Sequence, residues 1–220
     1  MVLPVGCDLA HLDQYAPGAQ RAGQTGKGPL ILWNQRWEYD KDPETLLWSL
    51  ATLAEEGLDF RVALAGENFR VQPAEFEAAR SRLGDRLIHF GFVEGAEAYG
   101  RLLWEADIVV STASHEFFGV GVVEALYCGC IPVLPDRLSY PELIPPASRA
   151  AYLYRDRADL LCHLRAAISA APADRSDPCL REWVRRFDWS AQAPLYDAML
   201  AEVVSRAVRS PTRDTGSGAT

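Results

Sequence analysis

Hydrophobic positions from residue 29 onward alternate between short continuous runs and longer stretches with helical spacing. The continuous runs are typical of strands that are buried on both faces of a parallel sheet. They predict strands at 29–34, 61–65, 86–90, 107–111, 131–134 and 151–154. The other stretches predict helices at 43–56, 73–83, 96–106, 119–128, 156–170, 179–187 and 191–208.

Strands that alternate with helices indicate β-α-β units around a parallel sheet. The predicted fold is therefore α/β, a Rossmann-like three-layer α/β/α sandwich over residues 29–208. Residues 1–28 contain several glycines and prolines without a sustained period, and we interpret them as an N-terminal arm or linker. Residues 209–220 also lack a period and are expected to form a disordered tail.

The amino-acid composition bears on the binding partners, the metal or disulfide sites and the cellular location of such a domain. With 22 basic and 30 acidic residues, the formal net charge of −8 disfavours stand-alone binding of nucleic acid or anionic membranes. No apolar run approaches the roughly 20 residues of a membrane helix, and no signal-peptide pattern is visible. The five cysteines form no C-x-x-C pair, so neither a zinc site nor a disulfide framework is indicated. A reduced, cytoplasmic location is expected.

Ligands of open parallel sheets bind beyond the carboxyl ends of the strands, so the loops after the strands are the places to search. The loop after the first strand, 34–41, lacks the G-x-G-x-x-G fingerprint, which argues against a nicotinamide-dependent oxidoreductase. It contains Arg36 and Lys41, and Lys41 is one of only two lysines in the chain. The two cations would together neutralise a diphosphate.

The loop after the fourth strand leads from Ser114 to Glu124 and combines three features. Gly119 and Gly121 allow a ligand to approach the backbone closely. A predicted helix begins there, and a helix N-terminus suits a phosphate. The carboxylates of Glu116 and Glu124 repel phosphate but accept hydrogen bonds from sugar hydroxyls. A sugar nucleotide fits this combination, because it has a diphosphate between two hydroxyl-rich rings.

These residues resemble the family-four retaining glycosyltransferases of GT-B fold, over roughly residues 3–205. The E-x7-E motif of that family matches Glu116 to Glu124, and its first-loop Arg and Lys match Arg36 and Lys41. Further similar segments lie at 3–8, 91–93, 125–129 and 187–189. The resemblance implies that the chain is the C-terminal, donor-binding half of a GT-B fold.

A closer similarity is to the tRNA-queuosine mannosyltransferases. The segments that carry it lie at 31–41, 88–92, 106–113 and 127–130. It implies GDP-mannose as the donor, the queuosine of a tRNA anticodon as the acceptor, and chemistry that needs neither a metal nor a cofactor. No membrane partner is implied.

The resemblance also implies which residues carry the reaction. Arg36, Lys41 and the helix N-terminus would stabilise the charge that grows on the β-phosphate. Glu116 would hold the hexose hydroxyls and Glu124 the ribose, while Phe92 and Val93 would present backbone to the base. The catalytic candidates are Arg36, Lys41 and Glu116. The donor-binding candidates are Phe92, Val93, Ser114, His115, Phe118, Gly119, Val120 and Glu124.

A complete GT-B enzyme has two Rossmann domains with the active site between them. The N-terminal, acceptor-binding domain is therefore an expected partner, in cis or in trans, and the isolated donor domain is expected to be inactive alone. The tRNA would be reached only through the complete enzyme. Two other functions stay open: a family-four transferase with another donor, such as a UDP-sugar, and a non-catalytic module that binds nucleotide sugars.

Several of these residues also have plainer interpretations. Glu116 and Glu124 could form a solvated acidic helix start, which the helix dipole favours, and Arg36 and Lys41 could be surface charges. His115 is equally compatible with a sugar contact and with a polar helix start. The residues interpreted as structural are Trp33, Trp37, Trp48, His89, Cys128 and Cys130.

Overall fold

A parallel sheet forms the centre of the computed structural model, which describes residues 3–17, 28–67 and 74–209. Its six strands lie in the order β3-β2-β1-β4-β5-β6 and all pair in parallel. The strands are β1 Leu30–Trp33, β2 Arg61–Ala65, β3 Leu87–Gly91, β4 Ile108–Val110, β5 Ile131–Pro135 and β6 Leu153–Tyr154. The order reverses between β1 and β4, which is where sheets of this kind leave a crevice for ligands.

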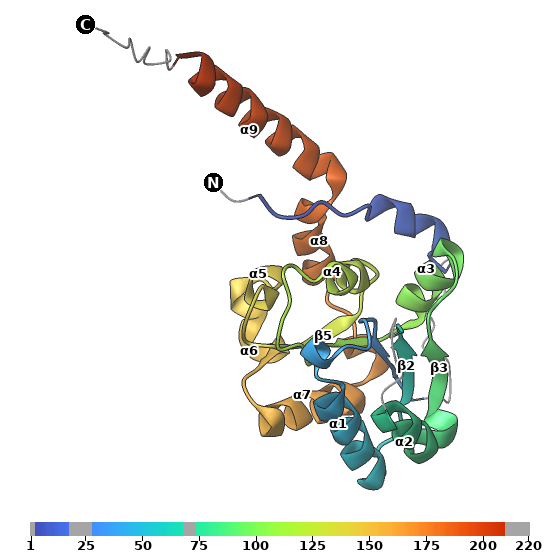
Figure 1. Cartoon of the computed structure of the whole chain (residues 1–220). Helices are drawn as coiled ribbons and strands as arrows, with labels where there is room; N and C mark the ends of the chain where they lie inside the picture. Colours follow the sequence, from blue (N-terminus) through green and yellow to red (C-terminus); the bar gives the residue numbers. More distant parts are fainter. Residues whose placement is uncertain (1–2, 18–27, 68–73, 210–220) are drawn as a thin grey trace, which may run out of the picture.

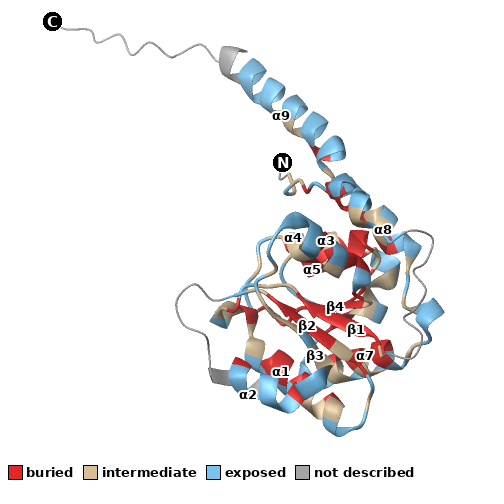
Figure 2. Cartoon of the chain, turned by 90° about the vertical axis from the view of Figure 1, so that its right-hand side faces the viewer, coloured by how far each residue is buried: buried red, intermediate tan, exposed pale blue. Residues whose placement is uncertain are grey.

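Helices cover both faces of the sheet and make the predicted three-layer α/β/α sandwich. Helices α1, α2 and α7 lie on one face, whereas α3, α4 and α8 lie on the other (Figures 1 and 2). The bounds are α1 Pro43–Glu55, α2 Ala74–Leu83, α3 Ala96–Glu105, α4 Val120–Tyr127, α5 Tyr140–Leu143, α6 Arg149–Tyr152, α7 Arg157–Ser169, α8 Pro178–Val184 and α9 Trp189–Arg209. No helix within the described ranges has the length and apolarity that crossing a membrane requires.

Side-chain alternation along the central strands divides the core between the two faces. Ile31 and Trp33 of β1 pack with α1, α2 and α7, and Leu30 and Leu32 pack on the opposite side. All four side chains are completely buried. The continuous apolar runs of the sequence arise because both faces of each central strand are covered.

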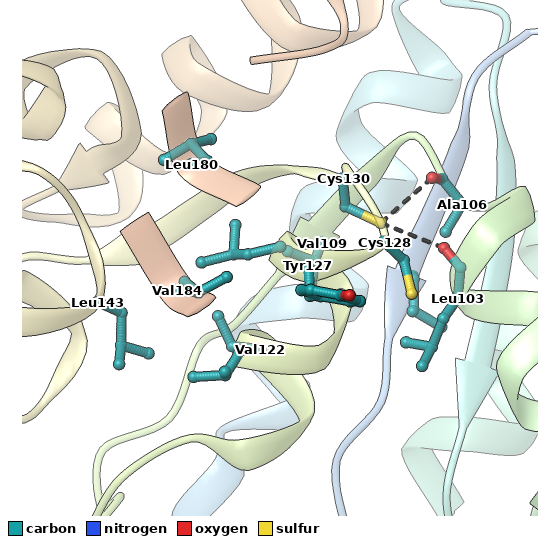
Figure 3. Packing of buried hydrophobic residues seen from close by; sticks show 14 of the residues in the cluster. Leu103, Ala106, Val109, Val122, Tyr127, Cys128, Cys130, Leu143, Leu180 and Val184 are labelled. Atoms are coloured by element: carbon teal, nitrogen blue, oxygen red, sulfur yellow. Dashed lines mark hydrogen bonds between the residues drawn. The ribbon is translucent and has the colours of Figure 1, made fainter. Parts of the chain in front are cut away.

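The thiols after α4 belong to the core, as the sequence predicted. Cys128 and Cys130 are buried, and Cys130 Sγ lies 3.2 Å from the carbonyl oxygen of Ala106 and 3.6 Å from that of Leu103 (Figure 3). Trp33 and Trp37 are also buried.

Trp48 differs from the other two predicted structural tryptophans. Its side chain is 39% exposed, and the Arg157 guanidinium carbon lies 4.9 Å from its ring centroid. The arginine covers the indole face, so Trp48 lies at the rim of the core rather than within it.

Only the second half of the sixth predicted strand, 151–154, is confirmed as a strand. Residues 149–152 form α6, and only Leu153 and Tyr154 pair with β5. Short apolar runs do not separate strand from helix, and Arg149 with two following alanines favours a helical turn. Helix α9 begins two residues before the predicted start, because Asp188 Oδ1 accepts a hydrogen bond from Ser190 N at 2.9 Å. The predicted tail lies outside the described residues, apart from Arg209 at the end of α9.

The described part of the predicted arm, residues 3–17, packs against the domain and is called here the N-terminal segment. Cys7 N donates to Phe187 O at 2.8 Å, and Trp189 N donates to Cys7 O at 2.9 Å. Leu9 and Leu12 are buried in the core on the α3–α4–α8 face. Beyond this junction, α9 extends away from the sandwich (Figures 1 and 2).

Asp188 joins this segment to α9. One carboxylate oxygen accepts from Leu9 N at 3.0 Å and Ala10 N at 3.2 Å, and the other accepts from Ser190 N. Partial burial alone would raise the pKa of Asp188, but these N–H groups and the Ser190 hydroxyl favour the carboxylate and hold the pKa below its ordinary value.

We expect Asp188→Asn to lower the free energy of unfolding by about 1 kcal/mol near neutral pH. The NH₂ group of the asparagine amide would face either Leu9 N and Ala10 N or Ser190 N, and it cannot accept a hydrogen bond from them. Because the pKa of Asp188 is lower in the folded state than in the unfolded state, its carboxylate stabilises the fold at pH values above the unfolded-state pKa. This contribution is therefore lost as pH falls below about 4 and through the folded pKa. Urea titrations at pH 7 and pH 3 measure it, with the exposed Asp8→Asn as the control. An equal loss at both pH values would contradict the charge-based explanation.

Candidate functional site

Two loops meet where the strand order reverses, and backbone hydrogen bonds join them. The first follows β1 and the second follows β4. The carbonyl oxygen of Asp40 accepts from Ser114 N at 2.8 Å and from His115 N at 3.2 Å. The Thr112 hydroxyl donates to the carbonyl oxygen of Lys41 at 2.8 Å. The two loops that sequence reasoning singled out therefore form one unit.

Lys41 lies at the centre of this unit and is only 6% exposed. Its Nζ donates to His115 O at 2.8 Å and to Glu116 Oε2 at 3.1 Å, and it lies 3.3 Å from Asp40 Oδ2. A buried ammonium needs such partners, because desolvation would otherwise favour its neutral form. Because Lys41 is buried, the alternative interpretation of the sequence, in which Lys41 is a surface charge, is wrong.

Glu116 is held from both sides. One carboxylate oxygen binds Lys41, and the other accepts from Phe117 N at 3.0 Å and Phe118 N at 3.3 Å. The chain then turns into α4 at Gly119, whose φ of +93° lies in the left-handed region that favours glycine. No side chain caps the N-terminus of α4, so its positive end is not covered by a capping group of the chain.

Glu124 faces a different direction from Glu116. Tyr99 Oη on α3 donates to Glu124 Oε2 at 2.9 Å, and Asn34 Nδ2 donates to Tyr99 Oη at 2.9 Å. Burial raises the pKa of Glu124, and the hydrogen bond from Tyr99 opposes that rise. The two glutamates of the motif therefore belong to separate hydrogen-bond networks at the two sides of the α4 N-terminus.

A cavity of about 490 Å³ opens beyond the carboxyl ends of β1, β2 and β3. Its lining residues are Asn34, Gln35, Arg36, Ala65, Gly66, Glu67, Phe92, Val93, Gly95, Ala96 and Tyr99. The predicted residues Arg36, Phe92 and Val93 thus lie together here. A cavity of this size, mostly apolar with a few polar groups, suits a small organic ligand.

The remaining candidates lie on the loop before α4 and at its start. Arg36, on the loop after β1, is exposed and pairs with Glu38 at 3.4 Å. Phe118 packs edge to face on Phe187, with ring centroids 5.1 Å apart. Ser114, His115 and Val120 are exposed, and Gly119 is buried. His89 Nε2 lies 2.9 Å from the backbone carbonyl oxygen of Gly91.

Sequence reasoning missed several residues of the site. Asn34 and Gln35 directly follow β1, and their position at a strand end was the available signal. Gly66 follows β2, and a Cβ atom there would lie 2.0 Å from the carbonyl oxygen of Gln35, so only glycine fits. Tyr99 gave no such signal, because an aromatic residue within a helix usually indicates core packing.

Among the described residues, no group of three or more His, Cys, Asp or Glu side chains is arranged to hold a metal ion. The prediction of metal-independent chemistry stays a prediction.

Comparison with known proteins identifies the family. The model described as "Glycosyl transferases group 1" matches residues 19–165. The tRNA-queuosine alpha-mannosyltransferase of Drosophila melanogaster is 46% identical over 115 residues, which cover 52% of this chain and 30% of that protein. The GDP-mannose-dependent alpha-(1-6)-phosphatidylinositol dimannoside mannosyltransferase of Mycobacterium tuberculosis is 26% identical over 217 residues, or 98% of this chain and 55% of that protein. The matched regions thus span only 30% and 55% of the lengths of these two relatives.

Solved structures agree at the level of fold. A glycosyltransferase from Rickettsia africae has a TM-score of 0.75 at 15% identity, covering 93% of this chain and 57% of that one. Sucrose-phosphate synthase from Thermosynechococcus elongatus has a TM-score of 0.72 at 22% identity, with coverage of 94% and 53%. HepE from Anabaena in complex with UDP has a TM-score of 0.69 at 19% identity, with coverage of 90% and 56%.

These proteins are GT-B glycosyltransferases, and the chain has the Rossmann-like α/β fold of one of their halves. The family model covers more than half of the chain, including both loops of the site. The chain therefore belongs to the glycosyl transferases group 1 family.

Proposed function

We propose that the chain is the donor-binding part of a retaining glycosyltransferase that transfers mannose from GDP-mannose to queuosine in tRNA. The names of the Drosophila and mycobacterial relatives support a mannosyltransferase, and that of the mycobacterial relative supports GDP-mannose as the donor. The queuosine acceptor is supported by the 46% identity to the Drosophila protein over about half of this chain.

The observation that carries this proposal is the buried Lys41 beside Glu116 at the switch point of the sheet. The ammonium attracts a diphosphate, and the adjacent carboxylate can accept hydrogen bonds from a hexose. The start of α4 follows directly in sequence and supplies N–H groups. A ligand with both an anionic and a hydroxyl-rich part suits this pairing of charges.

Glycosyl transfer breaks the bond between the anomeric carbon and the β-phosphate oxygen and forms a bond from that carbon to the acceptor hydroxyl oxygen, whose proton passes to the leaving β-phosphate. The sugar becomes oxocarbenium-like while negative charge grows on the β-phosphate. Lys41, Arg36 and the N-terminus of α4 stabilise that charge where it develops, without a metal ion. Glu116 orients the hexose, and no residue of the chain acts as a covalent nucleophile. The acceptor and its domain approach from the opposite side, in cis or in trans.

The base of the donor is tested by calorimetric titration with GDP, UDP and ADP. We expect GDP to bind most tightly, because the similarity to the relatives named for GDP-mannose includes the loop 34–41 and the cavity beside it. Equal or reversed affinities for GDP and UDP would contradict GDP-mannose as the donor and leave the fold assignment intact.

A UDP-sugar donor is the second candidate. The observation that favours it is the likeness in fold to HepE structures that contain UDP or UDP-glucose. The same titration separates the two donors. The acceptor is tested by incubating the chain and its acceptor-binding domain with GDP-mannose and tRNA that does or does not contain queuosine, and label is expected only in the former.

A further inference from the structure

Two aromatic side chains at the candidate site are almost fully exposed to solvent. Tyr39 is 96% exposed and Phe117 is 88% exposed, more than any other large hydrophobic side chain of the described residues. Single exposed hydrophobic side chains are common on protein surfaces, but these two lie on the two loops of the site. Tyr39 is two residues before Lys41, and Phe117 directly follows Glu116. Their exposure therefore coincides with the part of the surface where the reaction is proposed to occur.

Backbone hydrogen bonds between the loops keep the two aromatic residues near each other. The carbonyl oxygen of Asp40, which follows Tyr39, accepts from the N–H of His115 at 3.2 Å. Since Phe117 is two residues beyond His115, standard backbone dimensions place the Cα atoms of Tyr39 and Phe117 within about 18 Å of each other. Neither residue lines the cavity beyond β1, β2 and β3. The two residues therefore lie beside the proposed reaction centre and outside the proposed nucleotide site.

The backbone of each residue is fixed, although its ring is open to contact. Phe117 N donates to Glu116 Oε1 at 3.0 Å, and the Phe117 ring packs edge to face against that of His115, with centroids 4.8 Å apart. Asp42 N donates to Tyr39 O at 3.1 Å and closes a 3-10 turn over Tyr39–Lys41. A contact surface on a fixed backbone loses little conformational entropy when a partner binds.

The charge of the chain favours rings over cations as its contacts to an RNA. The formal net charge is −8, so the domain as a whole gains little from the attraction of phosphates. Stacking between an aromatic side chain and a base does not depend on net charge, and every base offers a flat face. The bases of a single-stranded loop, such as an anticodon, are accessible for such contacts, whereas those inside a duplex are not.

We propose that Tyr39 and Phe117 stack with unpaired bases of the acceptor RNA and so hold the acceptor strand beside Lys41 and Glu116. The proposal rests on the proposed function, since it takes a nucleoside in a tRNA anticodon as the acceptor. The two rings are acceptor-binding groups and have no part in stabilising the charge of the leaving phosphate. Their contacts are the same in the bound acceptor and in the transition state, so they lower the KM for the RNA and leave kcat unchanged.

The experiment uses the complete enzyme, which is this chain with its acceptor-binding domain, saturated with GDP. It is titrated with a fluorescent anticodon stem–loop RNA that contains queuosine. Tyr39→Ala and Phe117→Ala are each expected to weaken RNA binding about tenfold. Tyr39→Phe and Phe117→Tyr keep an aromatic face and should bind the RNA as the wild type does. The control is Ile88→Ala, which removes an exposed side chain near the amino end of β3, away from the site, and should change nothing.

Salt dependence and kinetics distinguish stacking from other roles of the two rings. The alanine variants should weaken RNA binding by the same factor at low and at high salt, because the loss of a phosphate contact would instead change the slope. With saturating GDP-mannose, they should raise the KM for the RNA about tenfold at an unchanged kcat. Their affinity for GDP should equal that of the wild type, and thermal melts identify any variant that is not folded.

The outcomes separate this inference from the proposed function. If the wild-type enzyme neither binds nor mannosylates the RNA, the proposed acceptor is overturned together with the stacking contact. If the wild type does both and either alanine variant binds the RNA equally well, only the proposed pair of rings is overturned. A lower kcat at an unchanged KM would show that the rings pack against the acceptor-binding domain, which also overturns the stacking contact and leaves the proposed function intact.

Discussion

Replacing Lys41 with methionine is expected to weaken GDP binding about 10- to 100-fold and to leave guanosine binding unchanged. Methionine keeps the length and much of the volume of the buried stem but removes the ammonium. The carboxylates of Glu116 and Asp40 then lack their shared counter-charge and repel the diphosphate. In the complete enzyme the same change is expected to lower turnover about 100- to 1000-fold, because charge grows on the leaving phosphate.

Arg101→Met is the matched control for this experiment. Arg101 pairs with Glu97 on the exposed surface of α3, where the loss of a cation has little effect. Arg36→Ala should fall between the two, since its side chain is 59% exposed and solvent weakens its attraction to phosphate. An equal loss of guanosine and GDP affinity in Lys41→Met would show that Lys41 supports the fold of the loops instead of binding the diphosphate.

Glu116→Gln is expected to remove the additional affinity that the hexose gives GDP-mannose over GDP. Glutamine retains an oxygen that can accept from the N–H groups of Phe117 and Phe118, so the loop keeps its form. It loses the charge that strengthens hydrogen bonds from sugar hydroxyls, which is worth about 1.5 to 3 kcal/mol, or about 10- to 100-fold in affinity. GDP should bind at least as well as before, because Lys41 is then no longer neutralised by Glu116.

Titrating wild type, Glu116→Gln and the surface control Glu97→Gln with GDP and GDP-mannose measures this separation. The control removes an exposed carboxylate on α3 and should leave both affinities unchanged. If Glu116→Gln weakened both ligands by the same factor, Glu116 would be acting on the diphosphate or on the loop, and not on the hexose.

The sequence was sufficient to predict the sheet and its covering helices because their signals are local. Apolar runs marked β1 to β5, and helical spacing marked α1, which begins after Asp42, whose Oδ1 accepts from Thr45 N at 3.1 Å. The packing of residues 3–17 was not predicted, because Cys7 and Leu9 find their partners far away along the chain. Such long-range pairs leave no periodic pattern around either partner.

The residues of the site also differ in whether a local pattern in the sequence indicates them. Lys41 and Glu116 could be predicted from charged residues at strand ends, and the structure brings them to 3.1 Å from each other. Tyr99 could not, because its partner Glu124 lies on another helix and only the packing of α3 beside α4 brings them together. The three-dimensional structure was needed to show that Glu116 binds Lys41 whereas Glu124 accepts a hydrogen bond from Tyr99.

The hydrogen bonds between the N-terminal segment and Asp188 have a consequence for how the domain is made on the ribosome. Leu9 and Asp188 are 179 residues apart in sequence, so the acceptor for Leu9 N is synthesised long after the segment itself has emerged. At typical rates of translation this interval is about 9 to 36 s. Throughout it, Leu9 and Leu12 lack the α8 residues that complete their buried surroundings. The buried surroundings of Leu9 and Leu12 therefore stay incomplete until the last quarter of the domain has been synthesised.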